Sequence, residues 1–280
     1  MPFIETPGKP TLHYEFDDFT DEWKHAPVFI LQHGFGRSAW FWRRWVPYLS
    51  RHYKVVRPDL RGFGKSPLDF DPLTGYSVDG FVDDMLRVLD TVSPGSPVHY
   101  AGESIGGIVG MALAAKHPER LRSLTVVSSP TIIPQHVQDT FAFGHPTWQE
   151  GMRTMGPEAW AAAANGSSRF PPGTDAGLLA QYAKEMGRSN IESLVGLSLA
   201  AAQIDVSACL PLIRTPTLGI YPDGGKITGS EEDKVRKGIA GIRFVNMPTE
   251  YHSVQFLFAP ECATHALHFA AQIDGVPCRD

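Results

Sequence analysis

A serine flanked by glycines stands in the segment 102–106, Gly-Glu-Ser-Ile-Gly. The apolar run before it, residues 98–101, predicts a buried strand, and the apolar run after it, residues 105–116, predicts a helix. Glycines on either side of a serine at a strand-to-helix junction allow the tight turn that exposes the hydroxyl, the pattern of a nucleophile elbow. We therefore predict that Ser104 attacks a carbonyl carbon. The backbone N–H of Ile105, at the start of the helix, is expected to stabilise the resulting oxyanion.

A serine hydroxyl is a weak nucleophile near neutral pH until a base removes its proton. Of the eleven histidines in the chain, His252 is the best placed to act as this base. It follows the last predicted strand, residues 242–247, and the order nucleophile then histidine is the one in which this elbow occurs. His33 lies in a glycine-rich loop and is interpreted as shaping that loop.

A second oxyanion donor is predicted at the end of another buried strand. Residues 26–31 form an apolar run that is typical of a strand buried on both faces. The run leads into the segment 32–36, Gln-His-Gly-Phe-Gly, where glycines let backbone N–H groups turn inward. The N–H of Phe35 is the second donor that we expect beside Ser104.

The predicted nucleophile, base and oxyanion donors can meet only in a fold that brings the ends of different strands together. Strand-like and helix-like segments alternate up to residue 127, which favours a mostly parallel sheet with helices on both faces. In such a sheet functional groups gather at the carboxyl ends of the strands, where the sequence places both Phe35 and Ser104. The other predicted strands are residues 11–16, 53–58, 123–127 and 215–221, and the other predicted helices are residues 38–49, 76–92 and 260–273.

The composition changes between residues 130 and 208. Strand signals fade, alanine, methionine and aromatic residues increase, and glycines and prolines divide the segment into short helices. We interpret residues 130–208 as a helical cap, a lid with an apolar inner face, inserted into a core formed by residues 1–129 and 209–280. The aromatic residues that we expect to line a substrate pocket are Trp40, Trp148, Trp160 and Phe143.

The composition also excludes several classes of protein. The chain has 280 residues, a net charge of -5 and 20% charged residues without a basic block, which argues against nucleic acid as a partner. No apolar run reaches the roughly 18 residues of a membrane span, and the N-terminus lacks the pattern of a signal peptide. Three cysteines without metal-ligand spacing fit a reducing compartment. We therefore expect a cytoplasmic monomer or homodimer with no bound metal.

Besides the elbow, the chain carries three further motifs. The full set is His33-Gly34-Phe35-Gly36, Asp59-x-Arg61-Gly62-x-Gly64-x-Ser66, Gly102-x-Ser104-x-Gly106-Gly107 and the late His252. Together they resemble the α/β-hydrolase superfamily, most of all its capped esterases, lactonases and carbon–carbon hydrolases. The resemblance covers nearly the whole chain and implies an α/β-hydrolase fold, a Ser–His–acid triad, an acyl-enzyme intermediate and no cofactor. Dehalogenases and epoxide hydrolases of this superfamily carry an aspartate where Ser104 stands, so their chemistry is disfavoured.

The acid of the implied triad is where the sequence departs from the family. The family usually has G-x-x-D in the loop after the penultimate strand, whereas Pro222 and Gly225 stand at the glycine and aspartate positions here. Asp223, two residues early, is the first choice for the acid, and Glu250 is the alternative. Glu103, beside the nucleophile, is interpreted as supporting the elbow.

The predicted function is hydrolysis of an ester or lactone of a small to medium hydrophobic substrate through an acyl-enzyme on Ser104. Two alternatives use the same residues. One is hydrolysis of a carbon–carbon bond in a ring-cleavage diketone, and the other is a ligand receptor of the same fold with little turnover. Rapid hydrolysis of simple esters would distinguish the first function from both alternatives.

Overall fold

The computed structural model of the chain describes residues 2–225 and 229–277. The strands of its sheet are β1 (Phe3–Ile4), β2 (Leu12–Asp17), β3 (Val28–Gln32), β4 (Lys54–Pro58), β5 (Val98–Glu103), β6 (Leu121–Val127), β7 (Thr217–Pro222) and β8 (Arg243–Met247). They form one eight-stranded sheet in the order β1-β2-β4-β3-β5-β6-β7-β8. The pairs β1–β2 and β2–β4 are antiparallel, and all pairs from β4 to β8 are parallel. The predicted mostly parallel sheet is confirmed.

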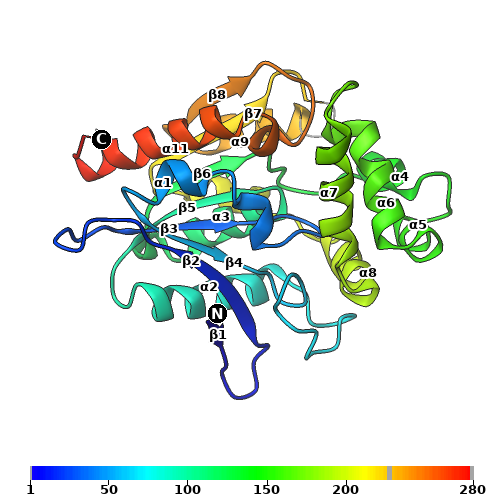
Figure 1. The fold of residues 1–280 in the computed structure, drawn as a ribbon, viewed down its shortest axis with the longest axis horizontal. Helices are drawn as coiled ribbons and strands as arrows, with labels where there is room; N and C mark the ends of the chain where they lie inside the picture. Colours follow the sequence, from blue (N-terminus) through cyan, green and yellow to red (C-terminus); the bar gives the residue numbers. More distant parts are fainter. Residues whose placement is uncertain (1, 226–228, 278–280) are drawn as a thin grey trace.

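Helices flank this sheet on both faces (Figure 1). The helices outside the segment between β6 and β7 are α1 (Val46–Leu49), α2 (Val78–Val92), α3 (Ile105–Lys116), α9 (Gly229–Gly238), α10 (Val254–Leu257) and α11 (Ala259–Asp274). Strand β3 shows why each face of the sheet needs a layer of helices, because all five residues of the strand are buried. Phe29 and Leu31 join the core cluster that contains α11 side chains, whereas Ile30 joins the cluster with α2 and α3. Successive side chains of a strand point to opposite faces, so an apolar run fills both layers.

The prediction of one helix over residues 38–49 is wrong. The structure has a 3₁₀ turn, η1 (Ala39–Trp42), followed by the short helix α1. Pro47 explains the break, because proline has no N–H to donate to the carbonyl of Arg43 and its ring clashes with that carbonyl in a continuous helix. The sequence patterns also missed β1 and α10, which are two and four residues long, and the highly charged helix α9.

A helical segment is inserted between β6 and β7. It contains α4 (Gln135–Ala142), α5 (Trp148–Met155), α6 (Pro157–Ala164), the π-helical turn η3 (Asn165–Arg169), α7 (Ala176–Gly187) and α8 (Ile191–Ala201). Figure 1 shows these green helices grouped at one end of the sheet. The two ends of the insertion meet, because Ile132 and Asp205 form an isolated antiparallel bridge and the N–H of Val206 donates to the carbonyl of Thr131 at 3.0 Å. The insertion therefore leaves and rejoins the sheet at one place.

Candidate active site

Ser104 sits in a strained turn between β5 and α3. Its backbone has φ 55° and ψ -118°, a conformation that residues other than glycine rarely adopt. A side chain at Gly102 would collide with the carbonyl of Gly106, and one at Gly106 would collide with the carbonyl of Gln32. The Ser129 hydroxyl, in the loop after β6, donates to the carbonyl of Ser104 at 2.7 Å and so holds the turn. The glycine spacing therefore produces the elbow that the sequence predicts.

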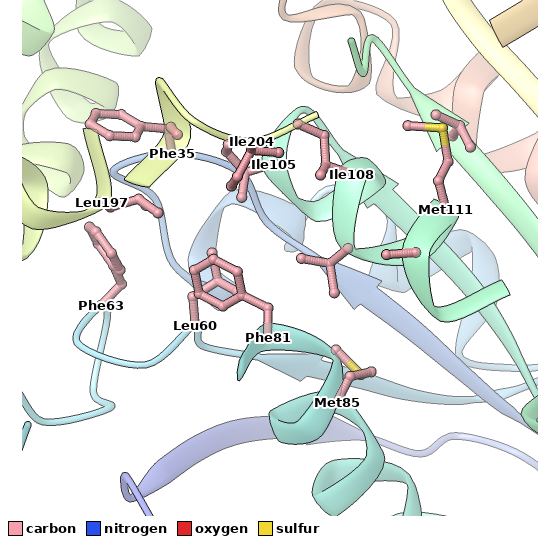
Figure 2. Close-up of a cluster of buried hydrophobic side chains, with 14 of the residues drawn as sticks. Phe35, Leu60, Phe63, Phe81, Met85, Ile105, Ile108, Met111, Leu197 and Ile204 are labelled. Carbon is pink, nitrogen blue, oxygen red and sulfur yellow. The ribbon is translucent and has the colours of Figure 1, made fainter. Parts of the chain in front are cut away.

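The loop after β3 lies directly against this elbow. A Cβ atom built on Gly34 would lie 2.6 Å from Oε2 of Glu103 and 2.9 Å from Cβ of Ser104, so only glycine fits this contact. The close approach brings Phe35 to the same cavity as Ser104 and Ile105. Figure 2 shows Phe35 and Ile105 in one buried cluster. Phe35 and Ile105 are the two residues whose N–H groups the sequence predicts as oxyanion donors.

His33 holds the shape of that loop. One ring nitrogen, Nε2, accepts a hydrogen bond from the N–H of Leu60 at 2.9 Å, and Nδ1 lies 2.9 Å from the carbonyl of Gly34. Burial lowers the pKa of His33, although the Asp59 carboxylate opposes this change. A neutral imidazole with Nδ1–H donating matches both contacts. His33 therefore acts on the loop, as the sequence analysis interprets it.

His252 follows β8 in a loop and is buried beside the elbow. Its Nε2 lies 3.2 Å from Oε1 of Glu103, while Nδ1 is buried without a hydrogen-bond partner among the described residues. The backbone N–H of His252 donates to the carbonyl of Ser168 at 3.0 Å, so the insertion fixes this loop. Burial lowers the pKa of His252; Glu103 opposes this effect, and Arg37 and Arg169 add to it. The imidazole is therefore neutral near pH 7 and has a lone pair that can accept a proton.

Glu103 is a buried carboxylate held by a buried guanidinium. Arg37, directly after the glycine-rich loop, forms an ion pair with its Oε2, and both side chains are at most 3% exposed. Burial alone would raise the pKa of Glu103, but Arg37 and His252 outweigh it and lower the pKa to about 2. Aromatic rings of Phe41 and Tyr182 lie 5.9 and 5.6 Å from the Arg37 guanidinium carbon. Glu103 therefore stays ionised against the imidazole.

The structure does not bring the predicted acid Asp223 to the imidazole. Asp223 is exposed in the turn after β7, where its N–H donates to the carbonyl of Met247 at 2.8 Å. Glu250 is also exposed. Of the three carboxylates considered from the sequence, the contact with His252 is made by Glu103.

An apolar cavity of about 50 Å³ lies over Ser104 and His252. Since one water molecule needs about 10–15 Å³ of such space, the cavity has room for only a few. Its lining consists of Phe35, Arg37, Ser104, Ile105, Pro130, Ile133, Val137, Phe141, Trp148, Arg169 and His252. Six of these residues, from Pro130 to Arg169, come from the segment between β6 and β7, which the sequence interprets as a cap.

Of the four predicted pocket aromatics, Trp148 lies in the lining. Trp160 is a step behind it, with ring centroids 6.3 Å from Trp148 and 5.9 Å from Phe35. Phe143 packs against Trp160 and outside the lining. Trp40 borders a separate surface cleft, where the Arg43 guanidinium lies 3.4 Å from its ring centroid.

Arg37 and Arg169 are not among the residues predicted from the sequence, and Glu103 is predicted only to support the elbow. Glu103 and Arg37 carry a local signal, because Glu103 lies inside the elbow motif and Arg37 directly follows the motif of residues 33–36. Arg169 carries none, because its position over the cavity depends on the folding of the whole insertion. No group of three or more metal-binding side chains occurs in the described ranges. The helices described are all too short or too polar to cross a bilayer.

Comparisons with known proteins identify the fold of the chain. A family model described as alpha/beta hydrolase fold matches residues 27–256. The chain is 30% identical over 216 residues to a protein of Stutzerimonas stutzeri (strain A1501) named as carbamate hydrolase RutD, which covers 74% of this chain and 76% of that protein. It is 40% identical over 106 residues to a pimeloyl-acyl-carrier-protein methyl ester esterase of Aeromonas hydrophila, which covers 38% of this chain and 39% of that protein.

Among solved structures, an enol-lactonase from Burkholderia xenovorans LB400 superimposes with a TM-score of 0.82. The sequence identity is 24%, and the alignment covers 96% of this chain and 99% of that chain. At this identity the likeness shows a shared fold.

Proposed function

The chain belongs to the family with the α/β hydrolase fold, and from that premise we propose that it is a serine hydrolase. It cleaves an ester or lactone of a small to medium hydrophobic substrate through an acyl-enzyme on Ser104. The observation that carries the proposal is that Ser104, on a strained elbow, shares one cavity with the buried, neutral imidazole of His252. A nucleophile and a base in one water-poor cavity are the minimum for acyl transfer.

In the proposed mechanism the Ser104 oxygen attacks the carbonyl carbon while His252 takes its proton. With a proton already on Nε2 facing Glu103, the unpartnered Nδ1 offers the lone pair that accepts the serine proton. The N–H groups of Phe35 and Ile105 stabilise the oxyanion. The imidazolium then protonates the leaving alcohol, and the neutral imidazole activates a water molecule that releases the acyl group from Ser104.

We propose that Glu103 fills the acid position for which the sequence suggested Asp223. Its carboxylate stabilises the imidazolium of His252 that forms as Ser104 attacks, and it fixes the ring orientation. Arg37 keeps the carboxylate ionised through the buried ion pair. Consecutive residues of the elbow would then supply both the acid and the nucleophile.

We propose that the helices of the insertion act as the cap over this site. Four of the lining residues come from α4, α5 and η3, namely Val137, Phe141, Trp148 and Arg169. A cavity that holds only a few water molecules is smaller than most ester substrates, so entry of the substrate requires part of the insertion to move.

A carbamate is the second candidate substrate class. The relative from Stutzerimonas stutzeri is named as a carbamate hydrolase, and a carbamate carbonyl can undergo the same attack by Ser104. The small cavity with two guanidinium groups suits a compact substrate of this kind.

The test is steady-state hydrolysis of 4-nitrophenyl acetate by the wild type and by Ser104→Ala. We expect turnover by the wild type, its loss in the variant, and labelling of Ser104 by an aryl phosphonate. Labelling with hardly any ester turnover would favour a carbon–carbon substrate or a receptor instead. Undiminished hydrolysis by Ser104→Ala would refute the assignment of the site.

A further inference from the structure

Arg169 is a buried cation without an ionic partner in the described part of the chain. It ends the π-helical turn η3 and is 4% exposed. Its guanidinium carbon lies 5.4 and 5.5 Å from the ring centroids of Phe141 and Trp160, and its Nη1 lies 3.2 Å from the sulfur of Met186. These contacts stabilise a cation only weakly compared with a carboxylate. Since π-helical turns are rare and often occur at functional sites, the position of Arg169 in one is consistent with a functional role.

The charges around the cavity do not balance. The charged side chains in its lining are Arg37 and Arg169, and His252 is neutral. Glu103 is paired with Arg37, so one positive charge remains. Burial lowers the pKa of Arg169 to about 10, and Arg37 adds to the effect, yet the group stays charged at neutral pH. An unpaired charge in an apolar cavity is unfavourable until a counter-charge arrives.

The position of this cation is fixed relative to the catalytic base. The carbonyl of Arg169 accepts a hydrogen bond from the N–H of Ser253 at 3.3 Å, and the carbonyl of Ser168 accepts one from the N–H of His252 at 3.0 Å. Two neighbouring backbone contacts therefore join η3 to the loop of the base. The backbone that carries the guanidinium is therefore held beside the loop of His252, and both side chains line the cavity of Ser104.

We propose that Arg169 binds a carboxylate of the substrate, so that the natural substrate is an ester or lactone carrying a carboxylate a few bonds from the scissile carbonyl. The planar guanidinium can donate two parallel hydrogen bonds to a carboxylate. Ile133, Val137 and Trp148 line the same cavity and contact the carbon chain between the two groups. This inference rests on the proposed serine hydrolase function.

The first test compares two esters of the same shape, 4-nitrophenyl hemiadipate and 4-nitrophenyl 6-methylheptanoate, in which an isopropyl group replaces the carboxylate. The wild type is expected to have the higher kcat/KM on the hemiadipate. Arg169→Met is expected to lower the ratio of the two kcat/KM values by about 10- to 100-fold, the range for hydrogen bonds to a charged group. Arg169→Lys, which keeps the charge but not the planar fork, is expected to give an intermediate ratio.

The second test is independent of turnover. Calorimetric titration of Ser104→Ala protein with hexanoate and with hexanamide is expected to show binding of the anion that is lost in the double variant with Arg169→Met. The control is Arg214→Met, which replaces an exposed arginine that donates to the carbonyls of Pro211 and Ile213. It should change neither the ester ratio nor hexanoate binding. Melting temperatures confirm that each variant is folded.

An Arg169-dependent ester ratio, or Arg169-dependent binding of hexanoate, supports the inference. The inference is overturned if Arg169→Met changes neither. If the wild type hydrolyses the neutral ester through Ser104 while neither readout depends on Arg169, this inference alone fails. If hexanoate binding depends on Arg169 but Ser104→Ala hydrolyses both esters as fast as the wild type, the proposed function alone fails.

Discussion

Oε1 of Glu103 lies 3.2 Å from Nε2 of His252, although Glu103 directly precedes the proposed nucleophile in the sequence. The elbow makes this possible. Strand β5 ends at Glu103, and the positive φ of Ser104 turns the chain sharply at the next residue. The side chains of Glu103 and Ser104 can therefore approach the imidazole of His252 from neighbouring positions on the backbone.

Replacement of Glu103 by glutamine is expected to lower kcat for an aryl ester strongly, because the imidazolium of His252 loses its stabilising charge. By analogy with the loss of the acid in a triad, the reduction should be about 10²- to 10⁴-fold. Asp223→Asn is the matched control, and its kcat should stay within about threefold of wild type because Asp223 is exposed in its turn. The assignment is contradicted if Asp223→Asn is the impaired variant and Glu103→Gln is nearly wild type.

The pH dependence of kcat/KM should have an acidic limb below the ordinary histidine pKa of about 6.5. The sign follows from the base, which works only when neutral, and burial lowers the pKa of His252. Removal of a nearby positive charge in Arg169→Met should raise this pKa and move the limb to higher pH, whereas Arg214→Met should not move it. A wild-type limb above pH 6.5 would mean that His252 is not the titrating base.

The sequence predicts the elbow because its causes are local. Gly102 and Gly106 are required by contacts within a few residues of Ser104 or with one neighbouring loop, so the motif alone specifies the geometry. The helix predicted over residues 38–49 failed for an equally local reason, since Pro47 outweighs the apolar spacing.

The acid and the cation could not be predicted in the same way. The choice of Asp223 rested on its place in a loop, but the fold leaves Asp223 exposed in the turn after β7. The carboxylate beside His252 must be one that can stay ionised when it is buried. Glu103 meets this condition because it forms an ion pair with Arg37. Arg169 reaches the cavity only because the insertion folds back and bonds to the loop of His252. Such contacts join residues far apart in sequence, and no local pattern encodes them.

The free energy of unfolding should fall as pH decreases from about 7.5 to about 5. His99 contributes to this slope: it is buried, with Nδ1 2.8 Å from the Ser123 hydroxyl and Nε2 3.0 Å from Asp274. Burial lowers its pKa in the folded state, although Asp274 opposes the change. Below about pH 6.5 the unfolded state therefore binds more protons, which favours unfolding. Urea titrations should show a shallower slope in His99→Gln, and an identical slope would contradict the account.

Gly34→Ala should impair catalysis more than stability. The added Cβ would lie 2.6 Å from Oε2 of Glu103 and 2.9 Å from Cβ of Ser104, so the loop that carries the N–H of Phe35 must retreat from the elbow. Loss of one oxyanion donor typically lowers kcat by about 10²- to 10³-fold, while overpacking costs about 1–3 kcal/mol of stability.

Gly229→Ala is the matched control for this substitution, because a Cβ there meets no described atom within 4 Å. The kcat values on 4-nitrophenyl acetate and the melting temperatures of both variants separate the two effects. If Gly34→Ala lost stability yet kept the wild-type kcat, the loop could move without disturbing the transition state, and Phe35 would not be an oxyanion donor. A loss of kcat that Gly229→Ala does not share would instead tie catalysis to the contact between this loop and the elbow.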